Sequence, residues 1–328
     1  MRNLGSFRGD LEITSMRSRR NVVDAPIQCA DRCAESSITL VTMLTRRSTR
    51  RWFSPFFCAT VSVALGAVYM YAARAPSYYL LVNFSALAAG LLAASLVRSA
   101  LVLNQQVVGT FTVAVGLVLL ATALVGHGVD GASRWVRIAG ISFQPSLILL
   151  PLVMVLFAGN RYWLSSIGLL LAGAALAFQP DRAVAGALTA GLAVQWAYRR
   201  DAWVTLSLAG ASCGFAATLV RDDHVPPAPF VEHVVQSAFA FDALYGLAIV
   251  AALVIPLIPA IVGVVTETED VVEYAVFGTT WLALIAFALG GNYPTPLAGY
   301  GTSGIVGYCL SSALLGRRRD LPSPSQAN

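Results

Sequence analysis

The residues best suited to chemistry in this chain lie where polar loops meet apolar segments. One such loop, GASRWVRIAGISFQPS at residues 131–146, contains Arg134 and Trp135 and ends in Gln144-Pro145-Ser146. An arginine guanidinium binds phosphate through paired hydrogen bonds, and a tryptophan suits the headgroup level of a membrane. Proline in the first turn of a helix loses no hydrogen bond. The stretch predicts a phosphate-binding loop at a helix start, or else an ordinary interfacial anchor.

Two later stretches have the same character. FQPD at residues 178–181 joins two apolar segments and includes Asp181, and PLAGYGTSGIVGYC at residues 296–309 includes Tyr300 and Ser303. Small residues such as those in GYGTSG also allow helices to pack closely, so close packing is the alternative interpretation of that stretch.

The composition indicates a polytopic membrane protein. Of the 328 residues, 57% are hydrophobic and only 12% are charged, whereas about a quarter of the residues in a soluble domain are charged. Every basic residue is arginine, which excludes mechanisms that need a lysine. The arginines lie at the ends of apolar segments rather than among aromatic residues, so we expect no nucleic-acid partner.

About ten apolar segments of membrane length, or slightly less, follow residue 52. The predicted fold is therefore all-α, a bundle of about ten transmembrane helices at 53–319. We expect residues 1–52 to be a disordered, arginine-rich cytoplasmic tail and 320–328 to be a second cytoplasmic tail. The expected segments are 53–72, 78–97, 105–126, 143–159, 162–178, 183–198, 202–220, 238–264, 272–290 and 299–316.

The distribution of arginines predicts the orientation. The N-terminal arginines, Arg98, Arg161, Arg199, Arg200 and the arginines at 317–319 share one side, which the positive-inside rule makes cytoplasmic. The opposite side collects unusual chemistry, since all three histidines and several acids map there. These residues are Arg74, Arg134, Arg137, Arg182, Arg221, His127, His224, His233, Asp130, Asp181, Asp222, Asp223 and Glu232.

The cysteines do not predict a metal site. Cys58, Cys213 and Cys309 fall inside apolar segments, where a thiol usually packs as a small apolar group. Cys29 and Cys33 form a C-x3-C pair without a nearby histidine. We therefore expect no metal and no cofactor.

Taken together, the three stretches resemble the SEDS family of bacterial cell-wall proteins, which includes FtsW, RodA and their sporulation relatives. The resemblance covers about residues 53–319 and depends on the order of the motifs. The matching positions are Gly131, Arg134, Trp135, Gly140, Gln144, Pro145, Ser146, the Gln-Pro-Asp at 179–181, Tyr300, Gly301 and Ser303.

The resemblance implies a peptidoglycan glycosyltransferase that polymerises lipid II, or a related undecaprenyl-linked sugar, on the outer face of the bacterial cytoplasmic membrane. It also implies a class B penicillin-binding protein as partner, with other divisome or elongasome membrane proteins. In this family an aspartate of the outer loop is the proposed base. The substrate-binding residues that we expect are Arg134, Trp135, Gln144, Ser146, Asp181, His233, Tyr300 and Ser303.

The chain departs from the family pattern at charged positions. Leu147 and Leu150 replace a glutamate and a lysine, and Val235 stands where the catalytic aspartate belongs. Asp223 or Asp222 are the candidate replacement bases, and Asp242 is a third, although it falls inside an apolar stretch.

Three functions follow from these residues. The first is a divergent SEDS protein of cell division or cell shape with inherited polymerase chemistry. The second is a catalytically inactive scaffold or regulator of the same machinery. The third is a flippase for lipid-linked sugars, although no convincing internal repeat of the kind common in transporters is visible.

Overall fold

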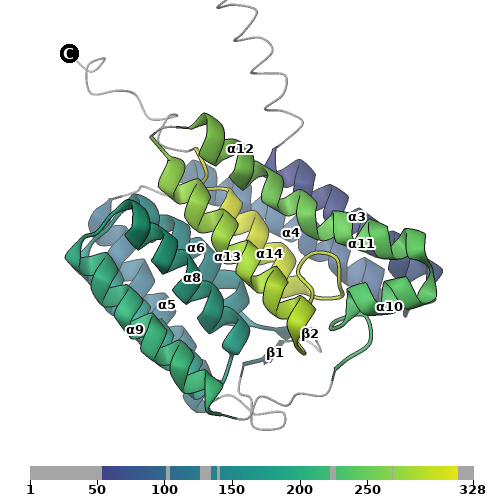
Figure 1. The fold of residues 1–328 in the computed structure, drawn as a ribbon, viewed down its shortest axis with the longest axis horizontal. Coiled ribbons are helices and arrows are strands. Elements are labelled where there is room, and N and C mark those ends of the chain that lie inside the picture. Colours follow the sequence, from purple (N-terminus) through teal and green to yellow (C-terminus); the bar gives the residue numbers. More distant parts are fainter. Residues whose placement is uncertain are drawn as a thin grey trace, which may run out of the picture. The chain divides into compact units, whose positions relative to one another are not determined.

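The computed structural model of the chain describes residues 54–100, 104–125, 134–138, 141–221, 227–267 and 269–316. The expected tails at 1–52 and 320–328 lie outside these residues. With the numbering of Figure 1, the elements are α3 (Pro55–Ala72), α4 (Ser77–Ala100), α5 (Gln105–Val125), β1 (Val136–Ile138), β2 (Ile141–Phe143), α6 (Pro145–Gly159), α7 (Trp163–Phe178), α8 (Arg182–Tyr198), α9 (Ala202–Leu219), α10 (Val234–Phe241), α11 (Ala243–Val254), η1 (Ile255–Leu257), α12 (Ile258–Thr266), α13 (Val271–Gly290) and α14 (Thr302–Ser312).

The predicted helical membrane fold is confirmed. Six helical stretches of the described chain are long and apolar enough to cross a bilayer: α3, α4, α5, α9, the continuous α11–α12 stretch and α13. The apolar helices α6 and α7 are shorter. These lengths establish a multi-pass membrane protein.

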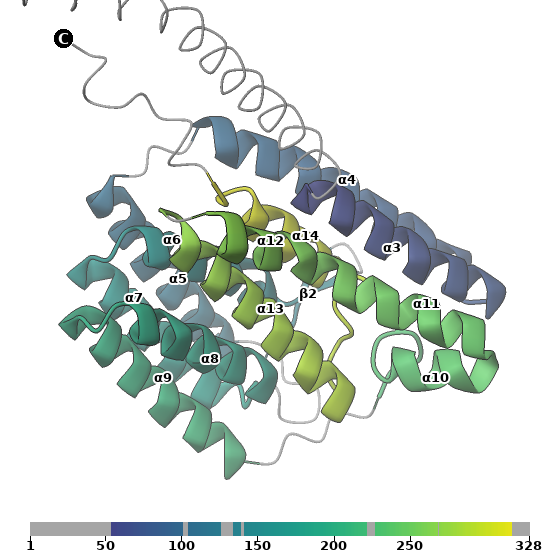
Figure 2. The ribbon, with the colours of Figure 1, turned by 45° about the horizontal axis from the view of Figure 1, so that its top comes forward.

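Helices α6, α8, α13 and α14 form the centre of the bundle, because α13 packs on both α6 and α8 and α14 packs on α6. On one flank α3 packs on α4 and α11, and α4 packs on α14. On the other flank α7 packs between α5 and α9, and α9 also contacts α8. Figures 1 and 2 show the two flanks on opposite sides of α13.

The starts of several helices follow from local chemistry. Pro145 occupies the first turn of α6, as its lack of an N–H favours. Asp181, Asp201 and Asp242 precede α8, α9 and α11, and each side chain accepts a hydrogen bond from a backbone N–H of the first turn. The short connection at 179–181 therefore ends one helix and begins the next, as the sequence predicts.

Three details correct the sequence prediction. Residues 136–138 and 141–143 form two short antiparallel strands in which Val136 pairs with Phe143, a small addition to the expected all-α fold. The expected segment 238–264 is interrupted because Asp242 ends α10 and caps α11, and Pro256 lies in the 3-10 turn η1. The expected segment 299–316 contains a shorter helix, α14.

Gly307 determines how closely α14 approaches α6. A Cβ atom at this position would lie 2.3 Å from the carbonyl oxygen of Leu147, so any larger residue would force the two helices apart. The small residues of α14 therefore do serve close packing. The same approach brings the first turns of α14 and α6 together.

Candidate functional site

The N-terminal ends of α6, α8 and α14 meet at the end of the bundle that holds the paired strands β1 and β2 (Figure 1). The backbone N–H of Gln144 donates to Ser303 Oγ over 2.8 Å, and Gln144 Nε2 donates to Asp181 Oδ2 over 2.6 Å. We call the group Arg134, Gln144, Ser146, Asp181 and Ser303 the three-helix cluster. Its members come from all three of the sequence stretches that the motifs define.

Asp181 is the centre of the three-helix cluster. Its side chain is completely buried, and Oδ1 accepts the N–H of Val184 over 3.2 Å as the cap of α8. Ser146 Oγ donates to Oδ2 over 3.3 Å, and Arg134 Nη1 lies 3.9 Å from Oδ1. Because helix N-termini carry partial positive charge, the ends of α6 and α8 both favour a carboxylate here. Asp181 thus uses its acceptor capacity within the protein.

Arg134 is held inside the protein by two kinds of partner. Its side chain is only 4% exposed, it forms the ion pair with Asp181, and its guanidinium carbon lies 5.8 Å from the centre of the Tyr293 ring. Removing one member of a buried ion pair leaves an uncompensated charge, so this contact strongly specifies the local fold. Arg137 on β1, by contrast, is exposed.

Two loops cover the neighbouring part of this end, and backbone hydrogen bonds join them. The N–H of Thr295 donates to Val231 O over 2.8 Å, and the N–H of Tyr300 donates to Phe230 O over 2.6 Å. Phe230 and His233 both have positive φ, 65° and 56° respectively, a conformation that is uncommon away from glycine. The loop before α10 is therefore held in a specific, strained shape.

Glu232 and His233 belong to this strained loop. Glu232 is buried and accepts the N–H of Ala228 over 2.7 Å, and His233 Nε2 lies 2.7 Å from Asn292 Oδ1. Burial raises the pKa of Glu232 above its ordinary value, although the Ala228 N–H and the charge of Arg134 act in the opposite direction. Burial therefore favours the protonated form of this carboxyl group.

Tyr300 lies beside the three-helix cluster in a separate aromatic group. Its ring stacks on Tyr79 with the ring centres 3.7 Å apart, and Tyr78 contacts it edge-on. Asn83, a buried amide in the apolar helix α4, donates to Gly299 O and accepts the N–H of Gly301. The loop before α14 is therefore fixed from the α4 side as well as from α6.

The structure brings together five of the predicted site residues, namely the three-helix cluster. Trp135 is partly exposed next to β1, while His233 and Tyr300 lie in the adjoining loops with partners of their own. Several residues that the sequence places on this side lie outside the described ranges: Asp222, Asp223, His127, His224 and Asp130. Within the described ranges, no three His, Cys, Asp or Glu side chains form a metal-ligand set.

Sequence reasoning missed Asn83, Asn292 and Tyr293. Asn83 carried a usable signal, since a lone amide in an apolar segment is costly and normally has a specific partner. Asn292 and Tyr293 carried no signal in the sequence, because their contacts are with residues far away in the chain.

No protein-family model and no curated protein matches the sequence. Solved structures do match. The rod shape determining protein RodA of Thermus thermophilus aligns with a TM-score of 0.57 and 19% identity, over 83% of this chain and 98% of that chain. The chain has the RodA fold. An aspartate-to-alanine mutant of the same RodA aligns with a TM-score of 0.56 and 20% identity.

A third match to the RodA fold is a chain from a structure that describes how polymerization and crosslinking are coordinated by a peptidoglycan synthase complex. It aligns with a TM-score of 0.54 and 19% identity, over 82% of this chain and 98% of that chain. The resemblance seen in the motifs is thus confirmed at the level of the fold, over nearly the whole length of each match. At these identities the comparison establishes the fold alone.

Proposed function

We propose that this chain is a divergent member of the SEDS family that acts in peptidoglycan synthesis during cell division or cell-shape maintenance. It crosses the bacterial cytoplasmic membrane about ten times, with both termini in the cytoplasm and the three-helix cluster toward the outside. Its substrate is lipid II or a related undecaprenyl-linked sugar, and its partner is a class B penicillin-binding protein. The inherited activity is transfer of the growing glycan to the next lipid-linked sugar.

One observation carries the proposal. The motifs picked out by their likeness to SEDS sequences come from three distant parts of the chain, yet Arg134, Asp181 and Ser303 all belong to one connected cluster in a RodA-like fold. Chance likeness of short motifs does not require this convergence. A functional site inherited with the fold requires that its residues lie together.

Within this proposal the cluster and its surroundings have different roles. Asp181 and Arg134 are buried and form an ion pair, so they hold the shape of the site. Trp135, His233 and Tyr300 retain partial exposure and remain accessible to a lipid-linked sugar. Mutation of the buried pair will act through folding, whereas mutation of the exposed residues will act on substrate binding.

A second candidate, a non-catalytic scaffold or regulator, is favoured by Val235. This residue stands at the position of the family's catalytic aspartate, in the first turn of α10, and packs against an apolar cluster that includes Tyr69, Val234 and Ile249. A valine cannot accept a proton. Asp242, the next acid along the chain, is engaged as the exposed cap of α11.

The decisive experiment uses the full chain purified with a class B penicillin-binding protein whose own chemistry is limited to crosslinking, together with lipid II. Polymer formed by the wild type and lost in Asp223→Ala or Asp222→Ala supports the enzyme. Glu269→Gln is the matched control, because Glu269 is an exposed acid in the loop before α13, at the opposite end from the three-helix cluster. It should keep full activity.

The other outcomes separate the alternatives. A silent wild type that gains activity in Val235→Asp identifies a protein that has lost its base and acts as a scaffold. Translocation of the lipid in vesicles without polymer identifies a flippase. A chain that neither binds nor consumes lipid II contradicts the proposed substrate.

A further inference from the structure

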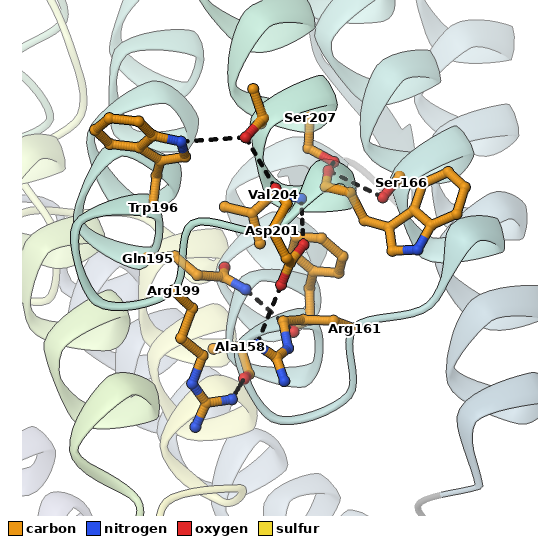
Figure 3. Close-up of polar contacts among 12 residues, drawn as sticks. Ala158, Arg161, Ser166, Gln195, Trp196, Arg199, Asp201, Val204 and Ser207 are labelled. Atoms are coloured by element: carbon orange, nitrogen blue, oxygen red, sulfur yellow. Dashed lines mark hydrogen bonds and ion pairs between the residues drawn. The ribbon is translucent and has the colours of Figure 1, made fainter.

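The turns α6–α7 and α8–α9 lie side by side (Figure 3), at the C-terminal ends of α6 and α8 and so away from the three-helix cluster. Arg161 Nη1 lies 3.1 Å from Asp201 Oδ2, which ties one turn to the other. Arg199 Nη1 donates to Ala158 O over 3.4 Å, at the end of α6. We call residues 161 and 199–201 the double turn.

The double turn is positively charged. It contains three arginines and one aspartate, which leaves a net charge of +2. Asp201 caps α9 by accepting the N–H of Val204 over 2.9 Å, so its charge is already used by a helix N-terminus as well as by Arg161. Within the double turn, the guanidinium groups therefore outnumber the carboxylate by three to one.

Arg200 is the most available of these cations. Its side chain is exposed, and its guanidinium carbon lies 4.9 Å from the centre of the Trp196 ring. Among the described residues it has no hydrogen-bonded or ion-paired partner. An arginine that rests on an indole face keeps its N–H groups directed outward and can bind a phosphate through two of them.

Three tryptophans flank the double turn at the ends of the helices that it joins. Trp163 begins α7 and is 43% exposed, and Trp203 lies in the first turn of α9 and is 44% exposed. Together with Trp196, they account for three of the six tryptophans of the chain. Because tryptophan prefers the headgroup region, these rings place the arginines at the depth of lipid phosphates.

We propose that the double turn binds the phosphate headgroup of an anionic phospholipid. Under the orientation proposed above, this lipid belongs to the cytoplasmic leaflet, where anionic headgroups attract juxtamembrane arginines. Arg200 and Arg199 supply the charge, Trp196 orients Arg200, and Trp163 and Trp203 contact the upper acyl chain. The Arg161–Asp201 pair keeps the two turns in register. The site is independent of the lipid II site at the other end.

The test is native mass spectrometry of the full chain in detergent with added phosphatidylglycerol, and with phosphatidylcholine as the neutral comparison. The wild type should retain phosphatidylglycerol in preference to phosphatidylcholine. Each basic residue near an anionic surface strengthens its binding to anionic lipid. Arg200→Ala should therefore bind phosphatidylglycerol about fivefold more weakly. The double variant Arg199→Ala, Arg200→Ala should lose the preference.

Arg221→Ala is the matched control. Arg221 is also an exposed arginine over an aromatic ring, 5.8 Å from the centre of Phe178, but it follows α9 at the opposite end of that helix. It should bind phosphatidylglycerol as the wild type does. Equal binding of the two lipids by the wild type, or undiminished preference in the double variant, would overturn the proposal. Because Arg200 is exposed, its loss should leave the unfolding temperature in lipid-free detergent unchanged.

Discussion

Helices α8 and α9 begin in the same way but in different surroundings. Asp181-Arg-Ala-Val184 and Asp201-Ala-Trp-Val204 share an aspartate followed three residues later by valine. In both, the carboxylate accepts the valine N–H, over 3.2 Å and 2.9 Å respectively. Each aspartate also pairs with an arginine from elsewhere in the chain, Arg134 for Asp181 and Arg161 for Asp201.

The two pairs differ in burial. Arg134 and Asp181 are 4% and 0% exposed, whereas the side chains of Arg161 and Asp201 are both 34% exposed. Water screens the second pair and can replace either partner, but it cannot reach the first. The same Asp-x-x-Val pattern therefore produces an exposed, replaceable helix cap at one end of the bundle and a buried, structurally essential cap at the other. The predictions below test this difference.

The largest effect is expected for Asp181→Ala. This change removes a helix cap and leaves the Arg134 guanidinium buried without its carboxylate, which costs about 3–5 kcal/mol. The free energy of unfolding, measured by detergent denaturation in mixed micelles, should fall by that amount. A loss no greater than that of Asp201→Ala would show that burial does not distinguish the two caps.

The second prediction concerns the coupling of the buried pair. Arg134→Met combined with Asp181→Leu removes both charges and should cost less than the sum of the two single changes. Contacting residues typically couple by about 0.5–3 kcal/mol, and a buried charge pair belongs at the upper end. The same unfolding measurement on all four proteins gives the coupling energy. Strict additivity would mean that the pair has no energetic connection despite its geometry.

The third prediction is a moderate effect for Asp201→Ala. Loss of the cap costs about 1 kcal/mol, and loss of a half-exposed ion pair adds at most about 1 kcal/mol. Arg161→Ala should cost only the second part. High salt should shrink the difference between Arg161→Ala and the wild type, since it screens exposed charges. A salt-independent difference would show that the pair behaves as a buried one.

The smallest effect is a dependence of stability on pH that comes from Glu232, in the loop beside the three-helix cluster. The pKa of Glu232 is raised from 4.5 by burial, so the folded state holds its proton more tightly than the unfolded chain does. The stability that this provides is complete below pH 4.5 and is lost as pH rises through the folded-state pKa. Glu232→Gln lacks this loss, so its stability relative to the wild type should increase with pH. The test is to measure the free energy of unfolding of both proteins at pH 4 and at pH 8, roughly the range in which native carboxyl groups titrate. If the unfolding free energies of the wild type and Glu232→Gln changed with pH by the same amount, the prediction would be contradicted.

Much of the fold was predictable because its signals are local. The length of each apolar segment predicts most of the helices to within a few residues, and Pro145 correctly predicts where α6 begins. The split of the expected segment 238–264 was not predicted. It depends on the hydrogen bond that the Asp242 side chain accepts from the N–H of Leu244, which an apolar run does not reveal.

The candidate site was predictable in membership but not in geometry. Arg134, Gln144 and Asp181 were selected from sequence, and they do meet. The sequence suggested that Arg134 would face a ligand, whereas the structure buries it against Asp181 and Tyr293. The roles assigned to Trp135, His233 and Tyr300 stay predictions.

The sequence alone determined that this is a multi-pass helical membrane protein, because the length of each apolar segment and the charges that flank it are properties of consecutive residues. It also predicted which stretches would contribute residues to one site, and Arg134, Gln144 and Asp181 do meet. Only the tertiary structure decided which of the two aspartate caps is buried, because burial depends on the close approach of α6, α8 and α14. That approach rests on contacts such as Gly307 against Leu147, between residues 160 positions apart in the chain. No local pattern contains them.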